Sequence, residues 1–184
     1  MPKILGESRV GKHSYKLKRK RCDEDYAGIK SLYLALKEKK IFRYPVDNFA
    51  RFDKASKIIS IAVSLAFHDA GLNYKKLKNR ETGIISTSRS GSLVSQVNYF
   101  KDYIECGRVL GRGNFFIYTL PTSPLAEVAI HFGLRGPLFY LGLYKNSSDD
   151  NLIEEAKYLI SLKQAKMMLA ISSTIKETTA SLIG

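Results

Sequence analysis

The sequence predicts a single domain of the α/β class. Its 184 residues, 45% of them hydrophobic, are enough to bury one sizeable core. Segments with apolar residues at helical spacing alternate with short runs rich in β-branched and aromatic residues. This alternation predicts helices packed on a mixed, mostly parallel sheet. The chain shows no internal repeat and no low-complexity segment.

The first 80 residues predict a short strand followed by two helices. Residues 2–11 fit a short strand, and a basic run follows it. We expect the first helix to begin at Asp23, which can cap it, because apolar residues then recur at helical spacing as far as Leu36. A second helix fits residues 52–70 and is apolar nearly all round, so we expect it to be buried.

The remaining sequence predicts three strands and three helices. The strands fit residues 82–88, 137–143 and 166–173, whose apolar runs are short. The helices fit residues 93–104, 122–133 and 149–163. Pro124 suits the first turn of the second of these helices. A glycine-bearing loop and the aromatic run FFIYTLP separate the first from the second. We therefore expect a basic segment over residues 1–22, the folded domain over 23–177 and a C-terminal tail over 178–184.

Positive charge is concentrated in the N-terminal part of the chain. Residues 1–80 contain 20 Lys and Arg against 8 Asp and Glu, whereas residues 81–184 contain 10 against 9. The densest cluster is KHSYKLKRKR, residues 12–21. Such a cluster attracts polyanions through Coulomb forces that salt weakens. It is compatible with RNA, DNA, an anionic membrane or an acidic protein, and equally with a solvated arm that binds nothing.

The cysteines and histidines do not form a recognisable metal or disulfide pattern. Cys22 and Cys106 lie far apart, there is no CxxC pair, and the three histidines are scattered. We predict two free thiols, with Cys106 in the core, and neither a metal nor a cofactor. No apolar segment approaches the length of a membrane span, so we expect a cytoplasmic protein that does not insert into membranes.

Three stretches resemble the N-terminal half of the β-ketoacyl synthases, which have the thiolase-like fold. They are FARFDKASKIISIAVSLAFHDAGLN, ETGIISTSRSGS and LPTSPLAEVAIHFGLRGPLFYLG. Their order and spacing also fit, and the resemblance covers residues 49–173. It implies that the chain folds as half of a thiolase-like fold.

The same resemblance places the family's nucleophile at a position where this chain has none. In that family the strand after Gly-Pro leads to a cysteine at a helix N-terminus, where the helix amides favour the reactive thiolate. The matching position is Tyr144 or Lys145. A charged Lys145 near Asp149 and Asp150 is a poor nucleophile. The family's catalytic histidines come from a C-terminal half that this sequence does not contain. The resemblance therefore implies a degenerate ketosynthase without catalytic residues.

The helix predicted over residues 149–163 fits this interpretation. Its apolar residues fall on one face and its charged residues fall largely on the other. A ketosynthase helix at this place is packed on both faces. One polar face is what a half-length fold requires, or it is the contact surface for a partner chain.

The leading hypothesis is an accessory protein of fatty-acid, polyene or polyketide assembly. The resemblance implies an acidic acyl carrier protein or a full-length ketosynthase as partner, and a homodimer through FFIYTLP and residues 91–107. The residues expected to bind the partner are the basic ones of the N-terminal cluster: Lys12, Lys16, Lys18, Arg19, Lys20 and Arg21. The alternative is a nucleic-acid-binding protein that uses the same residues. An enzyme with relocated chemistry ranks third.

Overall fold

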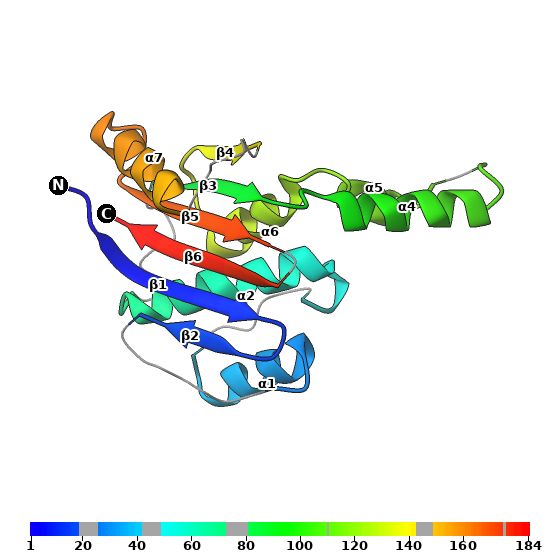
Figure 1. The fold of residues 1–184 in the computed structure, drawn as a ribbon, viewed down its shortest axis with the longest axis horizontal. Helices are drawn as coiled ribbons and strands as arrows, with labels where there is room; N and C mark the ends of the chain where they lie inside the picture. Colours follow the sequence, from blue (N-terminus) through cyan, green and yellow to red (C-terminus); the bar gives the residue numbers. More distant parts are fainter. Residues whose placement is uncertain (19–25, 42–48, 73–80, 110, 143–148, 175) are drawn as a thin grey trace.

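The computed structural model describes residues 1–18, 26–41, 49–72, 81–109, 111–142, 149–174 and 176–184. Among these residues a six-stranded sheet has the order β2-β1-β6-β5-β3-β4 (Figure 1). The strands are β1 (Ile4–Gly11), β2 (Tyr15–Leu17), β3 (Thr82–Ser88), β4 (Leu138–Leu141), β5 (Met167–Ser173) and β6 (Glu177–Ile183). The two chain ends meet, because the Lys3 and Gly184 backbones exchange hydrogen bonds of 3.0 and 3.1 Å.

The predicted α/β class and mixed sheet are confirmed, but the sheet is less parallel than expected. Only β3 pairs in parallel, with β4 on one side and β5 on the other, whereas β1–β2, β1–β6 and β5–β6 are antiparallel within the described part of the sheet. Connection length explains two of these pairs: β1–β2 and β5–β6 are hairpins, and a short turn can join only antiparallel strands.

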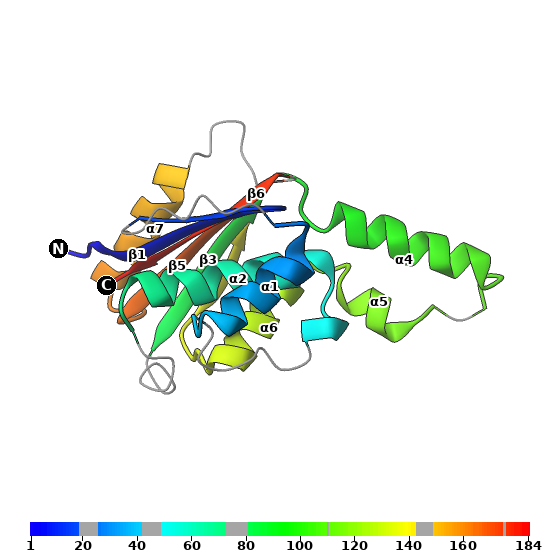
Figure 2. The same cartoon turned by 90° about the horizontal axis from the view of Figure 1, so that it is seen from below.

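Helices cover both faces of the sheet. On one face lie α1 (Ile29–Glu38), α2 (Lys54–Asp69) and α6 (Ser123–Phe132), with a 3₁₀ turn, η1 (Phe49–Arg51), before α2. Helix α7 (Asp149–Ser161) lies on the other face (Figure 2). Helices α4 (Leu93–Glu105) and α5 (Gly113–Ile117) extend away from the sheet as an arm (Figure 1).

Helix α2 is the buried centre of the larger core. Asp53 caps it by accepting a 2.7 Å hydrogen bond from the backbone N–H of Ser56. Residues 59–67 are all buried, as the nearly all-round apolar pattern predicted. The core also takes residues from β1, β3, β5, β6 and α6.

The contact between α2 and β1 depends on small residues. A Cβ atom at Gly6 would lie 2.5 Å from the Ala70 backbone nitrogen and 2.8 Å from the Ala70 Cβ. Nearby, the Ser8 hydroxyl donates a 2.6 Å hydrogen bond to the carbonyl of Ala62. The strand and the helix therefore lie closer together than larger side chains would permit.

The second glycine of the GLRGP motif, Gly136, is required for a similar steric reason. Gly136 donates a 3.0 Å backbone hydrogen bond to Thr82 at the start of β3. A Cβ atom there would lie 2.5 Å from the Thr82 carbonyl carbon and 2.7 Å from the Gly83 Cα. Glycine thus allows the chain to pass β3 before it forms β4.

The domain limits that we expected do not match the sheet. Residues 177–183, most of the expected tail, form the inner strand β6, and residues 4–17 of the expected basic segment form β1 and β2. Sequence alone did not show β6, because ETTASLI is polar and small rather than strongly apolar. Its Ala180 and Leu182 are nevertheless fully buried on the face that α2 covers.

Two local predictions also need correction. Cys106 is exposed rather than in the core, because the apolar side of α4 faces solvent. The first helix, as described, begins at Ile29 and not near residue 23, while residues 23–25 lie outside the described ranges.

We predict that Gly6→Ala destabilises the protein by about 1–3 kcal/mol, because the added methyl group would overlap the α2 backbone. For a chain of this length, thermal denaturation should show a melting temperature lower by several degrees.

Gly113→Ala is the matched control, because nothing lies within 4 Å of the Cβ position at Gly113. An equal melting temperature for the two variants would show that the β1–α2 contact is not tight.

Candidate docking groove

A basic groove of about 700 Å³ lies at the end of the sheet formed by the β1–β2 hairpin, the β5–β6 turn and the start of α2. Basic side chains from all of these segments line it: Arg9, Lys12, Lys16, Lys18, Lys54 and Lys176. They are separated by up to 167 positions in the sequence, so only the fold brings them together.

Strand alternation orients Lys16 of β2, and Lys18 directly after it, toward solvent. Tyr15 and Leu17 are 1% and 8% exposed and pack into the core, whereas Lys16 and Lys18 are exposed. Since successive side chains on a strand point to opposite faces, burial of Tyr15 and Leu17 orients the two lysines outward.

The loop that carries Lys12 is held in place from both sides. The Gly11 N–H donates a 2.8 Å hydrogen bond to the Ser14 carbonyl, which closes the hairpin. The Tyr26 N–H donates a 2.6 Å hydrogen bond to the His13 carbonyl, and the His13 Nδ1 lies 2.7 Å from the Tyr26 carbonyl oxygen. These hydrogen bonds give the loop a defined conformation, so it forms an ordered wall of the groove.

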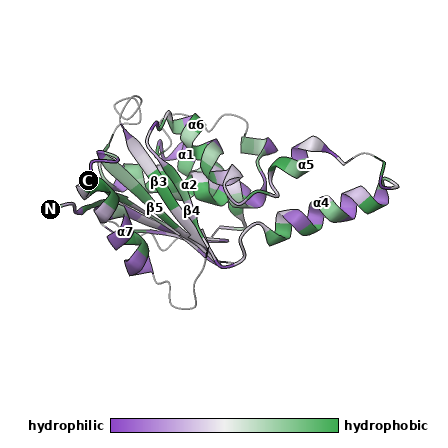
Figure 3. Cartoon of the chain, turned by 90° about the horizontal axis from the view of Figure 1, so that it is seen from above, coloured by the Kyte–Doolittle hydropathy of each residue, from purple (hydrophilic) through white to green (hydrophobic). Residues whose placement is uncertain are grey.

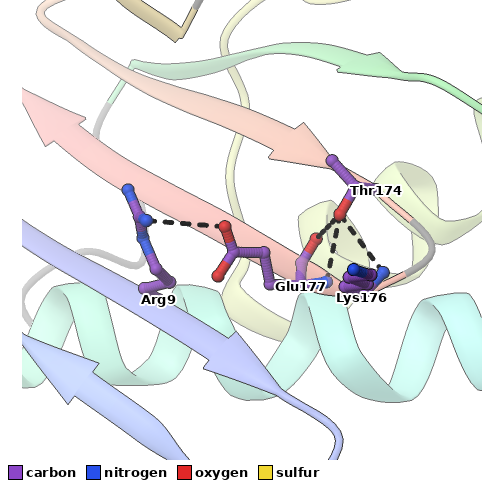
Figure 4. A network of polar contacts seen from close by, with 4 residues as sticks. All are labelled: Arg9, Thr174, Lys176 and Glu177. Carbon is purple, nitrogen blue, oxygen red and sulfur yellow. Dashed lines mark hydrogen bonds and ion pairs between the residues drawn. The ribbon is translucent and has the colours of Figure 1, made fainter.

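The β5–β6 turn positions Lys176 and Glu177 (Figure 4). The Thr174 hydroxyl accepts hydrogen bonds from the N–H groups of Lys176 and Glu177, at 3.2 and 3.1 Å, and donates to the Glu177 carbonyl at 3.1 Å. The Glu177 carboxylate pairs with Arg9 at 3.4 Å. Both charged side chains of this pair are nearly half exposed, so the pair adds little stability.

The groove carries a net positive charge. Six Lys and Arg side chains line it against two carboxylates, Glu7 and Glu177. The five lysines are exposed, so an acidic partner can reach their charges from solvent. Such a surface attracts acidic groups over a distance of about one Debye length, roughly 10 Å at moderate salt.

The structure describes three of the six residues that were expected to bind a partner. Lys12, Lys16 and Lys18 line the groove together. Arg19, Lys20 and Arg21 lie outside the described residues, as do Tyr144 and Lys145 of the expected nucleophile position. Sequence reasoning missed Arg9, Lys54 and Lys176, because each is a single charge outside the cluster and no local pattern distinguishes it.

The described ranges contain neither a candidate metal site nor a candidate membrane span. Within them, no group of three or more His, Cys, Asp or Glu side chains has the arrangement to hold a metal ion. No helix in these ranges combines the length and the apolar character needed to span a membrane.

The solved structures that match this fold include ketosynthases. The ishigamide ketosynthase/chain length factor matches with a TM-score of 0.66 and 13% identity over 99% of this chain and 61% of its own. A ketosynthase in complex with its chain length factor from Xenorhabdus doucetiae matches with a TM-score of 0.62 and 14% identity, over 99% of this chain and 78% of that one. A type II acyl carrier protein in complex with its ketosynthase, AntDE:AntF, gives a TM-score of 0.61 and 13% identity, over 99% and 61%.

This chain thus spans less than two thirds of the length of the first and third of these relatives. No significant match is found among the curated proteins. The family model for the N-terminal domain of β-ketoacyl synthases matches residues 7–184, which include most of β1 and all of β6. The chain therefore belongs to the β-ketoacyl synthase family, as a copy of its N-terminal domain.

Proposed function

We propose that this protein is a non-catalytic ketosynthase-like accessory factor that docks an acyl carrier protein during fatty-acid, polyene or polyketide assembly. The observation that carries the proposal is the groove, in which six basic side chains from separate segments converge. Carrier proteins of this family's pathways are acidic, so charge complementarity would both steer the encounter and orient the complex.

We infer that the protein is not catalytic from the residues at the expected nucleophile position. Tyr144 and Lys145 stand where the family has its cysteine, and neither side chain forms a thioester. Cys106 does not replace it, since it lies exposed at the C-terminal end of α4, on the arm that extends away from the sheet. The solved relatives include a ketosynthase with its chain length factor and a ketosynthase with its carrier protein, which supports both kinds of partner.

The arm formed by α4 and α5 supports a homodimer as the working unit. Large apolar side chains are exposed along it, with Phe100, Phe116 and Ile117 at 54–60% exposure. Figure 3 shows hydrophobic segments along both helices of the arm. Further exposed residues of the same kind are Leu93, Val94, Val97, Ile104, Val109, Phe115 and Leu120. Contiguous apolar surface of this kind marks a protein contact.

One ion pair stiffens this arm. Asp102 of α4 is 7% exposed, and its Oδ1 lies 2.6 Å from Nη2 of Arg112. Arg112 is the residue that precedes α5. Arg112 also lies 5.4 Å from the centre of the Phe115 ring. The arm is consequently a shaped surface that a second copy, or a full-length ketosynthase, would cover.

Nucleic-acid binding is the second candidate, because phosphates would suit the same basic side chains. One observation weighs against it. Tyr15, the aromatic residue within the basic cluster, is 1% exposed and therefore does not offer a surface on which a base could stack.

We predict that Lys12→Glu/Lys16→Glu/Lys18→Glu weakens binding of the acyl carrier protein encoded nearest to this one by about tenfold or more, because the groove's charge is reversed. Calorimetry at low and moderate salt would measure it, and the wild-type affinity should fall as salt rises.

The triple variant Lys30→Glu/Lys37→Glu/Lys163→Glu makes the same change in net charge on exposed sites outside both the groove and the arm, and should bind nearly as the wild type does. If the carrier protein binds neither the wild type nor the control, while single-stranded RNA binds the wild type and not the groove variant, the second candidate is correct.

We also predict that Phe100→Asp/Phe116→Asp converts a dimer into a monomer in light scattering, because two charges would enter the apolar contact. Ile130→Asp is the control: this residue is 78% exposed on α6, outside the arm, and its variant should remain dimeric. A wild type that is monomeric, and stays so when mixed with a ketosynthase, would contradict the role given to the arm.

A further inference from the structure

A second pocket, of about 200 Å³, lies on the face of the sheet that α2 and α6 cover. It opens at the carboxyl ends of β3 and β5, beside the start of α2 and the base of the arm. In open α/β sheets, ligands bind at the carboxyl ends of parallel strands. Helix α7 lies on the opposite face and contributes no residue to this pocket. The described residues of α7 therefore take no part in this pocket.

Hydroxyl groups supply most of the polar surface of this pocket. The residues that bring them are Ser86, Ser88, Ser90, Ser92, Ser95, Tyr118, Tyr140, Ser173, Thr174 and Thr178. At the strand ends, the hydroxyls of Ser173 and Thr178 lie 3.1 Å apart and share one hydrogen bond. That bond uses one of their two hydroxyl hydrogens, so the other can be donated to an acceptor on a ligand.

The lining contains one acidic and one basic residue, so it has no net charge. Its charged residues are Asp53 and Lys54. The Asp53 carboxylate is already occupied: Oδ1 accepts from the Ser56 N–H at 2.7 Å, and Oδ2 accepts from the Ser95 hydroxyl at 2.9 Å. Burial, together with the charges of Glu127 and Asp53, raises the pKa of Tyr118 to about 12, so this phenol stays neutral at physiological pH. An anion would meet the Asp53 carboxylate, and a cation would meet Lys54.

Apart from Gly91 and the amide of Asn98, the remaining wall is apolar. It is formed by Ile58, Ile59, Leu120, Pro121 and Leu125. A cavity of about 150 Å³ lined by such side chains is large enough for benzene. The pocket is polar at one end and apolar along its wall. Its volume therefore suits a molecule slightly larger than benzene that carries one polar group.

We propose that this pocket binds a small neutral molecule with an apolar chain or ring of about six carbon atoms and one amide or hydroxyl group. The polar group would hydrogen-bond the Ser173–Thr178 pair, and the apolar part would contact Ile58 and Leu125. The proposal does not depend on whether a carrier protein docks in the basic groove.

The test is an NMR titration of the ¹⁵N-labelled full chain with hexanamide. Expected are saturable shifts of the amides of Ser88, Ser90, Gly91, Thr174 and Thr178, with a dissociation constant on the order of 1 mM for so small a ligand. Hexanoate and hexylammonium have the same chain length and should bind about tenfold more weakly, because a charge would be desolvated without a partner. No saturable shift with hexanamide, or equal binding of a charged analogue, would overturn the proposal.

Two variants test the location. Ala55→Phe and Val94→Phe place an aromatic ring at the pocket from exposed positions and should each abolish the shifts. Ala27→Phe, at an exposed position that does not line the pocket, should bind hexanamide as the wild type does. Hexanamide binding that persists in both pocket variants would place the ligand elsewhere and refute the assignment.

Discussion

The close packing of α2 against β1 is the constraint on which the rest of this molecule depends. Gly6 leaves room for the α2 backbone, and the Ser8 hydroxyl ties the strand to the Ala62 carbonyl. Because β1 pairs with both β2 and β6, the distance between β1 and α2 also determines how far those two strands lie from the helix. The groove and the hydroxyl-lined pocket share Lys54 and Ile58 of α2, so both depend on this contact.

The central position of α2 has an energetic cost, which two buried polar atoms show. The hydroxyls of Ser56 and Ser60 are buried and have no hydrogen-bond partner among the described residues. A buried hydroxyl without a partner costs about 1–3 kcal/mol. Serine is small, however, and it fits at these two positions of α2, which are 0% exposed. Here close packing takes precedence over satisfying every polar group.

The two faces of the sheet are covered unequally. Helix α7 packs through Leu152 and Ala156 on a smaller core of Ile85, Met168 and Ala170, while its other side carries charged residues. Beyond α7, the same face of the sheet continues over β6 and β1 with the polar side chains of Thr179, Ser181, Glu7 and Arg9. A polar sheet face beside a one-sided helix is consistent with a family domain that spans about half of its longer relatives, and it explains why the helix pattern could be recognised from sequence.

The sequence by itself determined the α/β class, the burial of α2, the one-sided α7 and the family, because helical periodicity and the GLRGP turn are local properties. Tertiary structure alone decided that residues 177–183 become an inner strand, since their pairing with β1 and β5 joins positions up to 179 residues apart. It likewise decided that the apolar side of α4 is exposed with Cys106, because periodicity shows which residues share a face and not what covers that face. The charge cluster of residues 12–21 was visible in the sequence, but Arg9, Lys54 and Lys176 join it only through the strand order, which no local pattern encodes.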